Sequence, residues 1–497
     1  MNVLFSIINH VNTLELSRRL IKRYNSTQAC IITTDLLLEE ASKVHPDAYI
    51  YDQANNTKAD YSDCALYNSC PPVDKKLLDS MSKHEPIIMK MFERQERTER
   101  HLCYDERVRR YHVHLRYWNH MLEAAEIEVA VFVRTPHMIW DYIIFCLCKL
   151  KGIAVAYPFI VPGADDYGYF SSDIETQGHE VLEHYNALSE KYKDTPIDDI
   201  ELSADFQKIF DVQTGKDSSN KTPYYMKNYS GVSFLIHRIK NFPGKVRQRG
   251  ISHIKRAFLS LTVNKSFEKT RYFKTRTRKL FREYDKLSSP ADFNKSYIYL
   301  PLHYQPENTT SPMGGYFVHQ LLVAQMLSFY LPDNISIYVK ENPKQTACCR
   351  DSTLYHDLVK LPNVVLVDRK TDTYKLLEHC IAVASCTGTA GFEGMFIGKP
   401  NLMFGYYINM YAPGTFMIHN NEDCKDAIEN ILQHGTKFTL KDMKLYLKAL
   451  SEVSTKCMIR FIDPRDIFDE DKCNNLEIGL TGVIDKQISN SLEMEQK

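Results

Sequence analysis

Short apolar runs that alternate with helix-length amphipathic segments constrain the fold of this chain most. The runs lie at 3–8, 29–34, 48–51, 129–133 and 153–157, and a second series lies at 297–302, 335–340, 364–368, 381–386 and 400–405. Continuous β-branched and aromatic runs are typical of parallel strands that are buried on both faces. Because parallel strands need crossover helices, the pattern predicts an α/β fold with two Rossmann-like units in series.

The length of 497 residues also favours several domains. We predict an N-terminal α/β domain at 1–225, a basic helical connector at 226–292, a Rossmann-like domain at 293–450, and a C-terminal helix with a polar tail at 451–497. Helical periodicity predicts helices at 14–24, 105–125, 138–150, 315–330, 352–361, 372–380, 389–397 and 422–434.

Charge is balanced over the whole chain but not along it. The 62 Lys and Arg residues equal the 62 Asp and Glu residues, yet residues 238–282 contain fifteen Lys or Arg and one acid, Glu268. One interpretation is a solvated helical linker. The other is a basic arm that binds anionic lipid head groups or an acidic glycan. No nucleic-acid-binding motif accompanies the patch, so nucleic acid is not an expected partner.

The cysteines and the apolar segments indicate the compartment. Thirteen cysteines occur without zinc-site spacing, which favours reduced thiols in a cytoplasmic protein. The start of the chain lacks signal-peptide features, and no apolar stretch is long enough to cross a bilayer. We therefore expect a soluble protein or one peripheral to the inner face of the membrane. Asp165 and Asp166 lack DxD spacing and 469–471 is a general acidic stretch, so no metal or other cofactor is expected.

Ligands of open parallel sheets bind beyond the carboxyl ends of the strands, so the loops after predicted strands are the places to search. The loop 302–315 follows the run 297–302 and contains His303, Gln305 and Glu307. Glu307 could act as a general base or hold a sugar hydroxyl. The alternative is a capping loop in which Ser311 and Pro312 begin the next helix.

Two further loops carry the residue types that bind phosphate and hydroxyls. After the run 335–340, Lys340 could neutralise phosphate and Glu341 could accept a hydroxyl, although a solvent-facing strand end would look the same. The segment 385–394, SCTGTAGFEG, places hydroxyls and glycines where a strand gives way to a helix, which predicts a phosphate cradle with Glu393 on the ribose. It is neither GxGxxG nor Walker A, and ordinary helix capping is the alternative. Aromatics at 404–407 could stack on a base or belong to the core.

In the first half, the segment Arg134–His137 leaves the run 129–133 and precedes a predicted helix. His137 is a candidate for acceptor binding or acid–base catalysis, and a capping histidine would give the same pattern. His10, in the loop after the first run, is a candidate for the same roles, again with helix capping as the alternative.

The runs YLPLHYQPENTTSPMGG, YVKENP, LPNVVLV and SCTGTAGFEGMFIGKPNLMFG resemble the bacterial capsular polysaccharide biosynthesis proteins, a group that includes Kdo-transferring capsule enzymes. The resemblance covers about 297–435, with RTPH as an anchor in the first half. It implies a GT-B fold and a metal-independent cytoplasmic glycosyltransferase that uses a nucleotide-activated sugar, with CMP-linked donors among those implied. The implied site residues are Gln305, Glu307, Lys340, Glu341, Ser385, Thr387, Gly388, Thr389 and Glu393.

One residue departs from this family pattern. Asn342 stands where the family has His before the proline, and an amide cannot carry a proton or a positive charge. The expected partners remain a nucleotide-sugar and a glycan or glycolipid acceptor held near His137 and His10. A sugar-nucleotide epimerase or a polyol-phosphate transferase on the same scaffold stays open, as does a non-catalytic glycan-binding or capsule-assembly protein.

Overall fold

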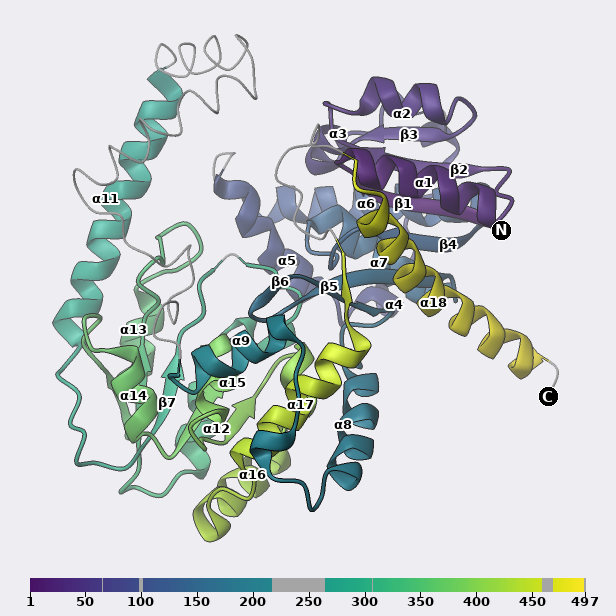
Figure 1. The fold of residues 1–497 in the computed structure, drawn as a ribbon. Helices are drawn as coiled ribbons and strands as arrows, with labels where there is room; N and C mark the ends of the chain where they lie inside the picture. Colours follow the sequence, from purple (N-terminus) through teal and green to yellow (C-terminus); the bar gives the residue numbers. More distant parts are fainter. Residues whose placement is uncertain (65, 98–101, 217–263, 306, 458–467, 496–497) are drawn as a thin grey trace, which may run out of the picture.

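The computed structural model describes residues 1–64, 66–97, 102–216, 264–305, 307–457 and 468–495, which form two β-sheets with helices around them (Figure 1). The first sheet has the strand order β13-β6-β5-β4-β1-β2-β3. Its strands are parallel except that β6 pairs antiparallel with β5 and β13. The bounds are β1 Asn2–Ile8, β2 Ala29–Thr33, β3 Tyr49–Asp52, β4 Ile127–Phe132, β5 Ala154–Val161, β6 Ala164–Ser171 and β13 Thr455–Lys456.

The second sheet is parallel throughout, in the order β12-β11-β10-β7-β8-β9. Its strands are β7 Tyr297–Pro301, β8 Ser336–Lys340, β9 Val364–Leu366, β10 Ala382–Ser385, β11 Asn401–Met403 and β12 Thr415–Met417. All ten apolar runs predicted as strands are therefore strands, and the mixed α/β class with parallel sheets is confirmed.

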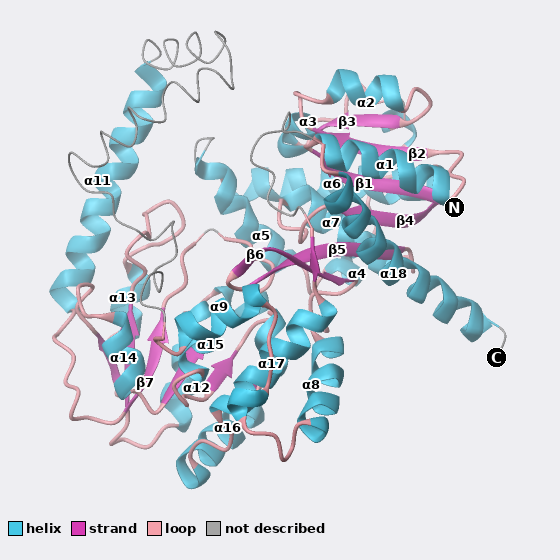
Figure 2. Cartoon of the chain, in the orientation of Figure 1, coloured by secondary structure: helices cyan, strands magenta, loops and turns pink. Residues whose placement is uncertain are grey.

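Helices connect and cover the strands (Figure 2). The predicted helical segments all coincide with helices, although 315–330 is divided into a short 3-10 turn and α12. The α-helices are α1 Val11–Arg23, α2 Leu38–Val44, α3 Gln53–Lys58, α4 Lys75–Met81, α5 Glu85–Met91, α6 Tyr104–Ala124, α7 Ile139–Leu150, α8 His179–Lys191, α9 Ala204–Gln213, α11 Asn264–Leu287, α12 Leu321–Tyr330, α13 Thr353–Leu358, α14 Thr373–His379, α15 Thr389–Met395, α16 Asn421–His434, α17 Leu440–Val453 and α18 Glu470–Glu495. The 3-10 helices are η1 Tyr67–Ser69, η2 Phe92–Arg97, η3 Ile197–Asp199, η5 Gly315–Val318 and η6 Ile408–Tyr411.

The first sheet is covered by helices on both faces. Successive side chains of each strand point to opposite sides of the sheet, so both sets are buried. Leu4 of β1 belongs to a core shared with α6 and α7, whereas Val3 and Phe5 belong to a core shared with α1 and α18. This double burial explains why β1 is apolar at nearly every position.

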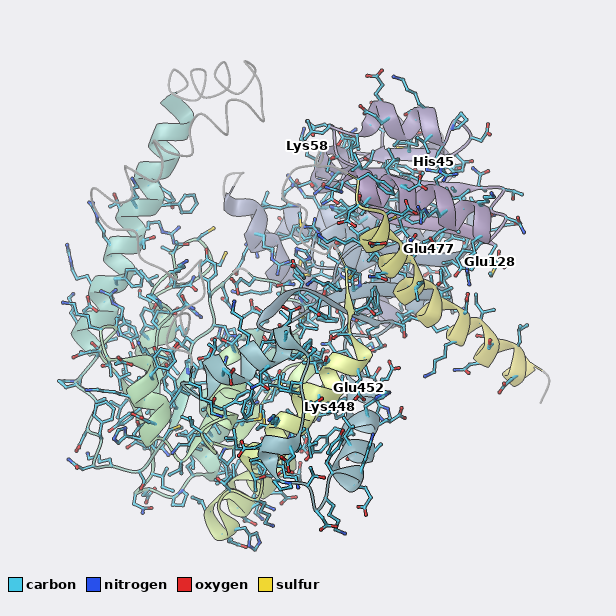
Figure 3. The ribbon with its side chains drawn as sticks, in the orientation of Figure 1. His45, Lys58, Glu128, Lys448, Glu452 and Glu477 are labelled. Carbon is cyan, nitrogen blue, oxygen red and sulfur yellow. The ribbon has the colours of Figure 1, made fainter. Side chains whose placement is uncertain are left out.

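Helix α18 runs back along the first sheet, although its sequence is largely polar (Figure 1). Leu476, Leu480 and Ile484 are at most 1% exposed, and each such burial contributes roughly 1.5–3 kcal/mol. Ion pairs also join α18 to α1, with Arg19 3.4 Å from Glu477. Figure 3 shows Glu477 on α18. Within the segment predicted as a C-terminal helix with a polar tail, residues Glu470–Glu495 form α18, which covers the first sheet.

The second sheet carries α12, α13 and α16 on one face and α14 on the other. Helix α15 reaches further, because Phe392 and Phe396 belong to the core of the first sheet. The ring of Phe396 lies 6.3 Å from that of Phe210 on α9. The two sheets are therefore joined through a common apolar core at α15.

Part of the predicted basic connector cannot be described. Residues 226–263 of the predicted connector lie outside the described residues. The described part, 264–292, consists of α11 and the five residues after it. Among the helices that the structure describes, none has the length and apolarity that crossing a membrane requires. All thirteen cysteines are free thiols.

Candidate functional site

Both sheets have a topological switch point, where the chain leaves one side of its first strand and later returns to the other. In the first sheet β1 lies between β2 and β4, and in the second sheet β7 lies between β8 and β10. Ligands of open α/β sheets bind at such points, beyond the carboxyl ends of the strands. The loops concerned are 9–10, 133–138, 302–314 and 386–388. Among the residues predicted for the site, these loops contain His10, His137, His303, Gln305, Glu307, Thr387 and Gly388.

His303 holds the two loops of the second switch point together. Its Nε2 accepts the backbone N–H of Cys386 at 3.1 Å, and its carbonyl accepts a hydrogen bond from Arg350 at 2.8 Å. A Cβ added at Gly388 would lie 2.8 Å from Cε1 of the ring, so only glycine fits there. Burial, assisted by Arg350, lowers the pKa of His303 to about 4. At neutral pH the ring is uncharged and positions the loops.

The predicted phosphate cradle is closed in its first half. Thr387 donates its hydroxyl to the carbonyl of Thr309, and Ser385 donates to Oδ1 of Asn401 at 3.4 Å. Both side chains are at most 2% exposed, so their hydroxyls face the protein. The two hydroxyls are therefore bound within the protein, that of Ser385 by the neighbouring strand β11 and that of Thr387 by the β7 loop.

The second half of the cradle is accessible. Gly388 and Ala390 are partly exposed and Thr389 is exposed. Gly388 is the N-cap of α15 and provides no side-chain hydrogen bond to the first-turn amides. Glu393, one turn further, is partly exposed. The prediction of phosphate binding thus rests on residues 388–390.

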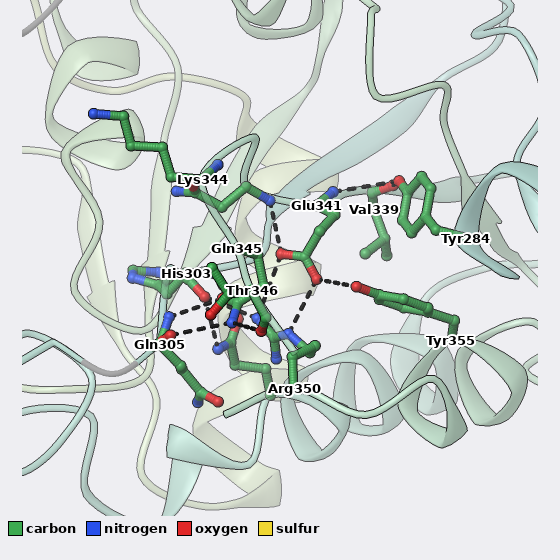
Figure 4. Close-up of polar contacts among 12 residues, drawn as sticks. Tyr284, His303, Gln305, Val339, Glu341, Lys344, Gln345, Thr346, Arg350 and Tyr355 are labelled. Atoms are coloured by element: carbon green, nitrogen blue, oxygen red, sulfur yellow. Dashed lines mark hydrogen bonds and ion pairs between the residues drawn. The ribbon is translucent and has the colours of Figure 1, made fainter. Parts of the chain in front are cut away.

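Lys340 and Glu341, at the end of β8, make internal contacts. The Lys340 ammonium donates to the carbonyl of Thr371 at 2.5 Å and to the hydroxyl of Thr373 at 2.8 Å, and burial lowers its pKa. The Glu341 carboxylate is 1% exposed and lies 3.0 Å from Nε of Arg350 (Figure 4). It also accepts the Tyr355 hydroxyl at 2.6 Å.

Asn342 and Gln305 complete this network of loop contacts. The Asn342 side chain accepts the backbone N–H of Lys344 at 3.0 Å, which stabilises the turn after β8. The Gln305 amide donates to the carbonyl of Val318 at 2.7 Å, and its backbone N–H donates to Gln345 at 2.9 Å (Figure 4). Neither contact involves the accessible residues 388–390, so both side chains support the loops from within.

Glu307 lies on the same β7 loop and is partly exposed. Its carboxylate accepts the hydroxyl of Thr309 at 3.2 Å, a contact that orients the carboxylate without burying it. Thr309 also accepts the bond from Thr387 through its carbonyl. Glu307 is therefore a partly exposed predicted catalytic residue on the loop that contacts the first half of the cradle.

Arg94 joins the two switch points. This residue of η2 donates to the carbonyl of His137, at the end of β4, and to the carbonyls of Glu307 and Ser311, in the β7 loop. A second contact runs from the Tyr316 hydroxyl to the carbonyl of Lys83 at 2.9 Å. The carboxyl-end loops of the two sheets thus meet through one guanidinium. The sequence did not reveal Arg94, because it follows no strand and lies in a uniformly charged stretch.

His137 has an environment that keeps it uncharged. Its Nδ1 lies 2.7 Å from the carbonyl of Thr135, to which it donates. Burial first, and then the charges of Arg134 and Arg94, lower its pKa to about 3. Nε2 is thus the acceptor nitrogen, so His137 can accept a hydrogen bond at neutral pH but cannot act as a general acid. Beside it, burial raises the pKa of Asp141 to about 7.

His10 caps the helix that follows β1. Its Nδ1 accepts the backbone N–H of Asn12 at 3.1 Å, and the ring is fully buried. The preceding Ile7 has a φ of 70°, which is unusual for a β-branched residue and marks local strain at this strand end. The structure therefore supports the capping alternative for His10.

No protein-family model and no curated protein matches this chain. Among solved structures, KpsC of Thermosulfurimonas dismutans, a β-Kdo 2,7-transferase, is similar over 76% of this chain and 90% of its own, with 12% identity and a TM-score of 0.29. The UDP-GlcNAc 2-epimerase of Methanocaldococcus jannaschii is similar over 91% of this chain and 100% of its own, with 10% identity and a TM-score of 0.24. The rhamnosyltransferase SpnG is similar over 91% of this chain and 96% of its own, with 12% identity and a TM-score of 0.23. These similarities are too low to carry a function from those proteins to this chain.

Proposed function

We propose that this chain is a GT-B-type glycosyltransferase that uses a nucleotide-activated sugar to build a capsular or other surface polysaccharide. One observation carries the proposal. The switch-point loops of the two sheets are joined by Arg94, which brings a carboxyl-end loop of each sheet to the same place. A transfer reaction needs a donor site and an acceptor site that meet, and two facing switch points provide them.

In the proposed reaction the second sheet holds the nucleotide beside residues 388–390. Backbone amides at the start of α15 are suited to the negative charge that develops on the departing phosphate. Glu307 accepts the proton of the attacking hydroxyl, and His137 orients that hydroxyl through its acceptor nitrogen. A nucleotide-sugar donor, with CMP-linked sugars among those that the family resemblance implies, and a reaction without a metal are also part of the proposal.

The nucleotide site can be tested by a charge change that spares the fold. Thr389→Glu adds an acid to an exposed first-turn position, where the helix dipole stabilises negative charge. We expect an unchanged or slightly higher Tm and a loss of at least about tenfold in affinity for the nucleotide-sugar that best stabilises the wild type. A thermal-shift series with CMP-, UDP-, GDP- and CDP-sugars identifies that ligand.

The matched control is Asn421→Glu, at the exposed first position of α16. It should leave the affinity for the nucleotide-sugar unchanged, and equal losses of affinity in both variants would contradict the assignment.

Product analysis then distinguishes the candidate reactions. Glu307→Gln should abolish acceptor-dependent transfer while nucleotide-sugar binding persists. Turnover of the donor without any acceptor would indicate an epimerase, and binding without turnover over a panel of acceptors would indicate a non-catalytic protein.

We also propose that α11 attaches the protein to an anionic membrane surface on the cytoplasmic side. Lys274, Arg278, Arg282 and Lys286 are exposed and recur every four residues, so they form one stripe about 18 Å long. The stripe borders a depression of about 510 Å³ lined by Arg278, Phe281, Arg282, Asp285, Lys286 and Arg369. Its one acid, Asp285, is already held by Arg369 through two contacts of 2.7 Å.

A further inference from the structure

Arg134 carries a partly buried positive charge that has no hydrogen bond or ion pair among the residues that the structure describes. It follows β4 at the switch point of the first sheet, and its Nε is buried without a hydrogen-bond partner. Within the described part of the chain, no hydrogen bond or ion pair reaches its other two nitrogens. The side chain as a whole is partly exposed, so these terminal nitrogens remain accessible.

An unpaired cation in such a place is costly, because burial removes its hydration without providing a partner. Burial lowers the pKa of Arg134, although a guanidinium stays protonated at any physiological pH. Asp141 is the acid that acts on it electrostatically, yet no ion pair within 4.0 Å joins the two among the described residues. The raised pKa of Asp141 also leaves this carboxyl only partly ionised at neutral pH.

A second arginine acts on the same histidine as Arg134. Arg94 contacts the carbonyl of His137, and the charges of Arg94 and Arg134 both act on the His137 ring. The partly accessible guanidinium fork of Arg134 can bind a carboxylate or phosphate through two hydrogen bonds.

We propose that Arg134 binds an oxyanion of the acceptor substrate, a carboxylate or a phosphate, at the carboxyl end of β4. The assignment to the acceptor rests on the proposed function, because that function places the nucleotide on the second sheet. The binding of an oxyanion by Arg134 does not depend on catalysis and can be measured without turnover.

The first test compares stability. Arg134→Met removes an unpaired buried charge and retains apolar volume, so we expect an unchanged or higher Tm for the protein without ligand. Arg109→Met is the matched control, since Arg109 is exposed and pairs with Glu106 on the surface. A Tm several degrees lower in Arg134→Met than in Arg109→Met would overturn the proposal by giving Arg134 a structural role.

The second test measures anion binding by calorimetric titration with inorganic phosphate, glucose 1-phosphate, glucuronate and neutral glucose. The wild type should bind at least one of the three anions and not glucose. Arg134→Met should weaken that binding by about tenfold or more. Arg134→Lys keeps a charge without the guanidinium fork, so its anion affinity should lie between those of the wild type and Arg134→Met. If Arg134→Met loses more affinity for glucose 1-phosphate than for glucuronate, the bound group is a phosphate. If it loses more affinity for glucuronate, the bound group is a carboxylate.

Equal anion affinity in the wild type and Arg134→Met would overturn the proposal, as would an equal loss in Arg109→Met. Nucleotide-sugar binding, measured in parallel, should persist in Arg134→Met. If the wild type binds oxyanions through Arg134 but binds no nucleotide-sugar, the proposed transferase function fails while the oxyanion site stands. If nucleotide-sugars bind and oxyanions do not, the oxyanion site fails alone.

Discussion

Glu341 illustrates how strongly the role of a residue depends on distant contacts. By sequence it is a carboxylate at a strand exit, where a ligand hydroxyl could bind. In the structure it is 1% exposed and engages Arg350 and Tyr355, nine and fourteen residues further on. Its contacts tie the β8 loop to α13, and α13 covers one face of the second sheet. The geometry therefore favours a stabilising role over direct ligand binding.

Glu341→Gln should lower the free energy of unfolding by about 3–5 kcal/mol, because it leaves the buried Arg350 without its counter-charge. Urea denaturation followed by circular dichroism measures this change. Glu378→Gln is the control, since Glu378 is an exposed acid on α14 and should change stability by less than about 0.5 kcal/mol. A variant with wild-type stability and lost nucleotide-sugar affinity would instead make Glu341 a ligand.

At the scale of elements, burial on both faces made the central strands predictable. β1, β4, β7 and β8 are continuous apolar runs, and each was located within a few residues. β6 was missed because its sequence ADDYGYFS contains two aspartates and a glycine, and it pairs antiparallel at the side of the first sheet. β12 and β13 were also missed: no residue of either strand is fully buried, and β13 has only two residues.

The loops of the site were predictable for the same reason, but their internal arrangement was not. A loop that follows a buried strand lies at the carboxyl edge wherever the sheet is parallel. Which side chains face inward depends on partners far away in sequence, as with Thr387 and Thr309, which are 78 residues apart. Arg94 contacts carbonyls 43 and 213 residues away and has no local signal.

The basic stripe of α11 gives a prediction about one helix. The wild type should sediment with phosphatidylglycerol-containing vesicles and not with pure phosphatidylcholine, and added salt should release it. Replacing Arg278, Arg282 and Lys286 by Gln should weaken partitioning by about tenfold or more, because three charges leave the stripe.

The control for this experiment is the triple replacement of Lys43, Lys75 and Lys76 by Gln, which removes the same charge from exposed positions of α2 and α4. Equal losses in both triple variants would show that net charge, and not the stripe, governs binding. No sedimentation of the wild type at low salt would contradict membrane attachment through α11 altogether.

At the scale of the whole molecule, two kinds of contact join the sheets. Apolar packing of Phe392 and Phe396 against the first core holds α15 in place. The polar contact through Arg94 holds the loops that carry the proposed chemistry. Since the apolar core remains when Arg94 is changed, the two contributions can be separated experimentally.

Arg94→Met should keep the protein folded and preserve nucleotide-sugar affinity within about twofold, because the proposed nucleotide site lies on the second sheet alone. Transfer should fall by about 100-fold, since small displacements of reacting groups have effects of that size. Hydrogen exchange should accelerate at 133–138 and 302–316 but not in β1 or β7, whereas Arg23→Met, an exposed control on α1, should change neither rate. Unchanged exchange in both loops would mean that Arg94 does not hold the switch points together, and the acceptor and donor sites would then have to meet through the α15 core instead.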